Sequence, residues 1–111
     1  MSSITDEYMK EMLAKTVPYT IMILRETRKI DEPGMDKVVW EHGRRNFQFR
    51  RDGKMNIVLP VRGDPNLAGI IVFSTGVEET RRIMDEDPGV KAGIFTYELY
   101  PARSFRGDAL K

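Results

Sequence analysis

His42 is the only histidine in the chain and the residue best suited to acid–base chemistry. Imidazole is the one side chain whose charge ordinarily changes near neutral pH, so His42 could act as a general base or general acid. Its spacing places it on the apolar face of an expected helix, one turn after Val38 and Val39. Taken alone, the pattern favours a structural role, in which His42 is buried and bonded to a backbone carbonyl. It does not exclude the catalytic role, so both interpretations stay open.

Other catalytic chemistries lack the residues that they need. The sequence has no cysteine, which excludes thiol catalysis, disulfides and thiolate metal sites. One histidine without an H-E-x-x-H or calcium-loop pattern predicts no metal site. Gly63, Gly69 and Gly76 do not have the spacing of a phosphate-binding loop, and no nucleophile elbow is present. We therefore expect no metal, nucleotide or flavin cofactor.

Composition indicates one globular domain with no strong preference for nucleic acid or membrane. Of 111 residues, 41% are hydrophobic and 32% are charged, and the net charge is +1. No apolar run approaches the roughly 20 residues needed to span a bilayer, and the N-terminus lacks a signal-peptide pattern, so we expect a cytoplasmic protein. One basic cluster is interpreted as a solvated helix face, because no RNA-binding signature surrounds it. It consists of Arg44, Arg45, Arg50 and Arg51.

The chain divides into an N-terminal helical extension, one domain and a short polar tail, expected over residues 1–18, 19–105 and 106–111. A helix over about 4–15 should be stopped by Pro18. Strands are expected over 19–25, 54–61, 67–74 and 94–101. Helices are expected over 35–51, ended by Asp52-Gly53, and over 77–86, capped by Ser74 or Thr75. A loop at 87–93 and a frayed end at 103–111 complete the prediction, with Pro60 favouring an edge strand.

After the first helix the order is β-α-β-β-α-β, which predicts a ferredoxin-like α+β fold. In that fold both helices lie on one face of a four-stranded antiparallel sheet, and strands 19–25 and 67–74 are central. Both of these strands are apolar on both sides, although a strand with one wet face should alternate apolar with polar residues.

Something must therefore cover the second face of the sheet. The N-terminal helix could fold across it, or a second subunit could pack against it. A helix of two or three turns hides only part of such a sheet, so the pattern favours a homodimer that pairs sheet to sheet.

The second half of the chain resembles the YCII-related family. The resemblance rests on ETRRIMDEDPGVKAGIF at residues 79–95, followed by Tyr97, Glu98 and Leu99. Upstream, His42 followed by Asp52-Gly53-Lys54 is similar to the H…G element of that family, and the resemblance covers residues 19–105. The sequence departs from the family at Leu59-Pro60, where a Gly-Pro is usual, and in its N-terminal helix.

The resemblance implies a dimeric α+β barrel with cytoplasmic members and a histidine–aspartate pair in a pocket. It makes Asp87 the expected partner of His42, with Asp85 as second choice, although an aspartate before proline also commonly ends a helix. Core packing or strand-end exposure is the ordinary role for the residues expected to bind substrate. These are Arg25 and Arg28 for an anionic group, and the aromatic residues Trp40 and Tyr97 for an apolar surface.

Three functional hypotheses follow from the residues and the resemblance together. The first is a cofactor-independent lyase or isomerase that acts on a small aromatic or enolisable compound, with His42 and Asp87 transferring a proton. The second is a non-catalytic ligand-binding or assembly module in which His42 is structural. A cofactor-free monooxygenase of the same barrel type also stays open.

Overall fold

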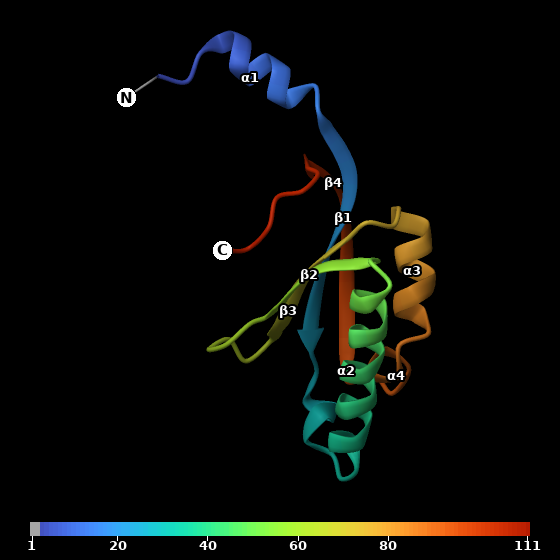
Figure 1. The fold of residues 1–111 in the computed structure, drawn as a ribbon. Helices are drawn as coiled ribbons and strands as arrows, with labels where there is room; N and C mark the ends of the chain where they lie inside the picture. The colour runs from blue at the N-terminus through green and yellow to red at the C-terminus, as the bar shows by residue number, and fades with distance from the viewer. Residues whose placement is uncertain (1–2) are drawn as a thin grey trace.

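The computed structural model describes residues 3–111 as a four-stranded antiparallel sheet with helices packed on one of its faces (Figure 1). The strand order is β2-β3-β1-β4, so the two central strands are β1 and β3, as predicted. This order confirms the α+β class and the ferredoxin-like plan. The elements are α1 (Asp6–Leu13), β1 (Thr16–Glu26), the 3-10 helix η1 (Arg28–Asp31), α2 (Met35–Arg51), β2 (Met55–Pro60), β3 (Leu67–Phe73), α3 (Val77–Asp85), α4 (Pro88–Lys91) and β4 (Phe95–Phe105).

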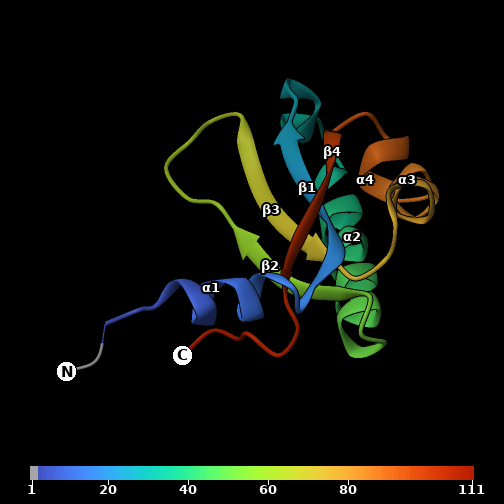
Figure 2. The ribbon, with the colours of Figure 1, turned by 90° about the horizontal axis from the view of Figure 1, so that it is seen from above.

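Alternate residues of the central strands build the core. In β1, Thr20, Met22 and Leu24 are buried, and they lie opposite the buried residues Phe73, Ile71 and Gly69 of β3. Seen from above, α2, α3 and α4 all lie on the side of the sheet that carries these buried residues (Figure 2). The buried apolar residues are Met22, Leu24, Met55, Ile71, Phe73, Ile83, Met84, Ile94 and Phe95.

Helix α2 carries the histidine and has the predicted bounds. Its 17 residues run from Met35 to Arg51, and His42 is its one buried residue. Gly53 ends the turn after the helix at φ 77°, a left-handed conformation that glycine adopts without strain. No helix within residues 3–111 is long and apolar enough to cross a membrane.

Both terminal predictions need correction, because β1 and β4 are longer than expected. Helix α1 ends at Leu13 without help from Pro18, and β1 then begins at Thr16 and passes through Pro18. Strand β4 passes through Pro101 and continues to Phe105, pairing with the start of β1. Pro18 is tolerated because β3 pairs with β1 only from Thr20 onward, which leaves that side of the strand open. Pro101 is tolerated because β4 is an edge strand, as is β2 with Pro60.

Two local predictions around α3 are also wrong. Gly76, not Ser74 or Thr75, is the N-cap residue of α3, and it provides no side-chain cap. The Thr75 hydroxyl is instead hydrogen-bonded to the Thr80 hydroxyl at 2.7 Å. The expected loop 87–93 contains α4, because the Asp87 side chain caps it and Pro88 is preset for the first helical position.

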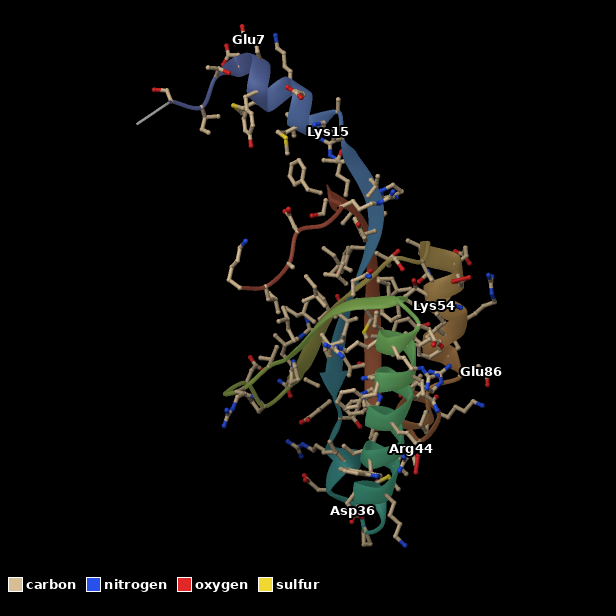
Figure 3. All side chains as sticks on the ribbon, in the orientation of Figure 1. Glu7, Lys15, Asp36, Arg44, Lys54 and Glu86 are labelled. Atoms are coloured by element: carbon tan, nitrogen blue, oxygen red, sulfur yellow. The ribbon has the colours of Figure 1, made fainter. Side chains whose placement is uncertain are left out.

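The second face of the sheet is not covered by α1. This helix has no buried residue and projects away from the domain, with Glu7 and Lys15 near its two ends (Figure 3). Of the two alternatives for covering this face, the less favoured one, in which α1 folds across its own sheet, is not found. We call the uncovered surface the open face. Its centre is formed by Ile21, Ile23, Ile57, Leu59, Ile70 and Val72.

Candidate functional site

His42 and Asp87 form a hydrogen-bonded pair although 45 positions separate them in the chain. The His42 Nδ1 lies 2.8 Å from Oδ1 and 2.9 Å from Oδ2 of the carboxylate. His42 is 8% exposed and Asp87 is fully buried. The central segment of α2 supplies the histidine and the turn between α3 and α4 supplies the aspartate, so the packing of α4 on α2 creates the pair.

The Asp87 carboxylate is held in place by several donors. It accepts hydrogen bonds from the backbone N–H groups of Gly89 at 2.9 Å and Val90 at 3.2 Å, which open α4. The guanidinium of Arg45 lies 3.8 Å from Oδ1 and packs over the Phe49 ring. Burial of a carboxylate is costly without such partners, and they also fix its orientation toward His42.

These contacts select one tautomer of the His42 imidazole. A carboxylate only accepts, so the Nδ1–H donates to Asp87 and the lone pair of the neutral ring stays on Nε2. The side-chain amide of Asn46, one turn later in α2, donates to this Nε2 at 3.2 Å. The imidazole ring also packs against Phe95, with 4.6 Å between the ring centroids and 45° between the planes. His42 is thus an oriented base whose basic nitrogen is Nε2.

Beside His42 lies a cavity of about 640 Å³ between α2 and the sheet. A volume of this size holds a small organic molecule. Its apolar wall includes Leu24, Val58, Ile71 and Phe95. Its polar lining consists of Glu26, His42, Asn46 and Arg50. An apolar cavity with a few polar groups suits a small compound that is largely carbon and polar at one edge.

Two of the residues predicted to bind substrate lie away from this cavity. Arg25 is on the open face, where it forms an ion pair with Glu98 at 2.6 Å. This partner raises the pKa of Arg25 and lowers that of Glu98, mainly through their side-chain hydrogen bond. Trp40 is 71% exposed on the outer side of α2, where it borders a smaller depression that shares Gly43 and Phe47 with the cavity.

Tyr97 and Asp85 are paired with each other instead of with the cavity or His42. The Tyr97 hydroxyl donates to the Asp85 carboxylate, which joins β4 to the end of α3. Burial and this hydrogen bond raise the pKa of Tyr97. Asp85 is therefore not the partner of His42, and Arg28 lies in η1 outside the cavity lining.

Sequence reasoning missed Glu26, Asn46 and Arg50 as cavity residues. A signal for two of them was present, because Asn46 and Arg50 follow His42 at intervals of four residues and thus lie on one side of a helix. Arg50 had been assigned to the solvated basic face. Within residues 3–111, no group of three or more histidine, aspartate or glutamate side chains is arranged to hold a metal ion.

Comparison with known proteins does not assign the chain to a family. No protein-family model matches it, and no curated protein matches it by sequence. A solved structure that does match is the 5-chloro-2-hydroxyhydroquinone dehydrochlorinase TftG from Burkholderia phenoliruptrix AC1100, in complex with 2,5-dihydroxybenzoquinone. It is 19% identical, with a TM-score of 0.47, over 79% of this chain and 95% of that chain. A likeness this weak assigns no function. The function has to come from the site itself.

Proposed function

We propose that the chain is a YCII-like, cofactor-independent enzyme that transfers a proton on a small aromatic or enolisable compound. His42 is the catalytic base, and Asp87 is the residue that positions it. One observation carries the proposal: the Nδ1 of His42 is bound to a fully buried carboxylate while its ring lines a cavity of substrate size. This arrangement leaves the lone pair on Nε2, and a bound compound that displaces the Asn46 amide from this nitrogen could give up its proton there.

The chemistry needs only groups that the chain contains. Nε2 takes a proton from a carbon next to a carbonyl, and the electron pair of that C–H bond moves to the carbonyl oxygen as an enolate. The imidazolium that forms is stabilised by Asp87, and the apolar wall of Leu24, Ile71 and Phe95 limits water. Return of the proton to a different atom gives an isomerase. Departure of a leaving group from the neighbouring carbon gives a lyase.

The substitution His42→Gln tests this proposal because it removes the basic nitrogen and keeps a side chain that can bind Asp87. A glutamine amide can still donate to Asp87, so the fold should survive, but it has no basic nitrogen. With phenylpyruvate as the probe, enol–keto interconversion is followed by ultraviolet absorbance. We expect wild type to accelerate it, and His42→Gln to lose about 100-fold or more of that rate, the usual contribution of a general base. Equal rates in the two proteins would rule His42 out as the base.

A second candidate, a ligand-binding module with a structural histidine, is favoured by one observation. Both ring nitrogens of His42 already have partners within the chain, Asp87 and Asn46. In this case wild type binds small ring compounds without converting them. His42→Ala then lowers the free energy of unfolding by about 1–3 kcal/mol because buried Asp87 loses a donor, and His42→Gln recovers most of it.

We also propose that a second copy of the chain covers the open face. No helix within residues 3–111 packs over the apolar residues at its centre, and α1 points elsewhere. Packing of two such faces buries a layer of isoleucine, leucine and valine side chains, and this burial is the main driving force for permanent dimers.

A further inference from the structure

A line of polar residues crosses the cavity wall along α2. His42, Asn46 and Arg50 follow one another at intervals of four residues, and all three line the same cavity. Each step of four residues advances roughly 6 Å along a helix and keeps nearly the same direction. The guanidinium of Arg50 therefore projects from a position about 12 Å along the axis from His42. Asn46 lies between the two.

Arg50 is not neutralised by its own chain. Within residues 3–111 it makes no ion pair, whereas the neighbouring arginines do: Arg44 pairs with Glu41, Arg45 lies near Asp87 and Arg51 pairs with Asp52. A guanidinium has five N–H donors in a planar fork that matches a carboxylate. Arg50 lines the cavity but is exposed to solvent, and no side chain in the described part of the chain pairs with its fork, so the guanidinium is available to a ligand.

The negative and the positive residue of the cavity lining, Glu26 and Arg50, lie at opposite ends of the cavity. Glu26, the one carboxylate in its lining, is the last residue of β1, and η1 then leads directly to the start of α2. Arg50 is in the last turn of α2. Asp36 marks the start of that helix, Arg44 its middle and Lys54 the residues just beyond its end (Figure 3). A negatively charged ligand group is thus attracted to the Arg50 end and repelled from the Glu26 end.

On the basis of the function proposed above, we propose that the substrate is an anion: a small ring compound with a carboxylate that Arg50 binds. The ring lies against Leu24, Val58 and Phe95, and the acidic carbon faces Nε2 of His42. The carboxylate then determines the orientation, because only one end of the cavity offers it a cation. Arg50 is a specificity-determining residue in this arrangement and takes no part in proton transfer.

The test compares phenylpyruvate with its uncharged methyl ester, by titration of the purified full-length protein. We expect wild type to bind the acid about 10-fold or more tighter than the ester, which is typical of a charge-assisted hydrogen bond. Arg50→Gln should lose that preference and bind the ester as wild type does. Arg51→Gln is the matched control, because Arg51 is the same residue type, one position later, outside the cavity lining.

Several results would overturn the anion site. They are equal binding of acid and ester by wild type, no binding of either probe, and the same loss of preference in Arg51→Gln as in Arg50→Gln. The outcome is separable from that of the proposed function. If His42→Gln keeps the full rate while Arg50→Gln loses the preference, His42 is not the base but the anion site stands. If His42→Gln stops turnover and Arg50→Gln keeps the preference, the anion site is wrong.

Discussion

At the scale of single residues, the Asp87 side chain connects two helices, α2 and α4. Its carboxylate accepts from the His42 ring on α2 and from the N–H groups of Gly89 and Val90 at the start of α4. The side chain is fully buried, so water cannot replace a lost acceptor. The same carboxylate thus holds His42, the candidate base, and caps the first turn of α4.

The substitution Asp87→Asn should therefore destabilise the fold as well as the site. The amide has almost the same shape, but its NH₂ group would face either the α4 N–H groups, which also donate, or the His42 ring, which would then have to take the other tautomer and lose the lone pair on Nε2. We expect the free energy of unfolding to fall by about 1–3 kcal/mol, measured by urea denaturation, together with loss of proton transfer.

Asp85→Asn is the matched control for that experiment. Asp85 lies two positions earlier and accepts one hydrogen bond, from the Tyr97 hydroxyl, which an asparagine oxygen can still accept. We expect its effect to stay below about 1 kcal/mol. A similar loss in both variants would show that Asp87 has no special role.

The family resemblance predicted the pair, but the residue pattern assigned some of the surrounding residues wrongly. His42 and Asp87 were named through a family motif, whereas Arg25 was assigned to substrate binding although it lies on the open face. Side chains alternate along a strand, so Arg25 shares a face with Ile23 and Leu24 lies on the other. Because both faces of β1 are apolar, its sequence does not show which face the helices cover.

At the scale of the elements, Gly43 is an unusual residue for the middle of α2. A Cβ added there would have no atom within 4 Å, and its backbone is not left-handed, so alanine fits without strain. Glycine in a helix interior costs about 1 kcal/mol relative to alanine. Gly43 also lines both the cavity beside His42 and the outer depression beside Trp40.

We therefore expect Gly43→Ala to raise the free energy of unfolding by about 0.5–1 kcal/mol, visible as a higher melting temperature. The added methyl group narrows the cavity, so binding of phenylpyruvate should weaken at the same time. Gly34→Ala is the control: Gly34 has φ 87° at the start of α2, and a side chain there should destabilise by about 1 kcal/mol. A fall in stability for Gly43→Ala would contradict this reading of the helix.

Most of the main elements and their bounds were predicted well, but the segments around Pro18, Pro88 and Pro101 were not. Pro18 was interpreted as the stop of the first helix and residue 101 as the end of the last strand, yet both prolines lie inside strands. A missing N–H disrupts a strand only where a neighbour would have used it, and pairing partners are set by tertiary structure. Similarly, Asp87 and Pro88 were interpreted as a turn, and the same two residues cap and begin α4.

At the scale of the whole molecule, one face of the sheet is covered by helices and the other, the open face, is not. Helices α2, α3 and α4 cover the first, and nothing in the described part of the chain covers the centre of the second (Figures 1 and 2). Ile70 lies in the middle of this open face, between Ile23 on β1 and Leu59 on β2. The rim carries the Arg25–Glu98 ion pair, with the Tyr100 hydroxyl donating to Glu98.

If two copies pair through their open faces, Ile70→Lys should separate them. The substitution places a charge at the centre of a buried apolar layer, where it has no partner and is costly to desolvate. In a single chain the same lysine can extend into water, so the monomer should remain folded. Light scattering at micromolar concentration should give twice the 12.8 kDa chain mass for wild type and that chain mass for Ile70→Lys.

The substitution Gln48→Lys separates the effect of position from the effect of charge. Gln48 is exposed on α2, on the other side of the molecule from the open face, and the substitution adds the same positive charge. It should leave the wild-type mass unchanged. Circular dichroism of Ile70→Lys should match wild type, because a misfolded variant would also lose the dimer. A wild-type protein that is monomeric at micromolar concentration would contradict the homodimer, and the open face would then need a different partner.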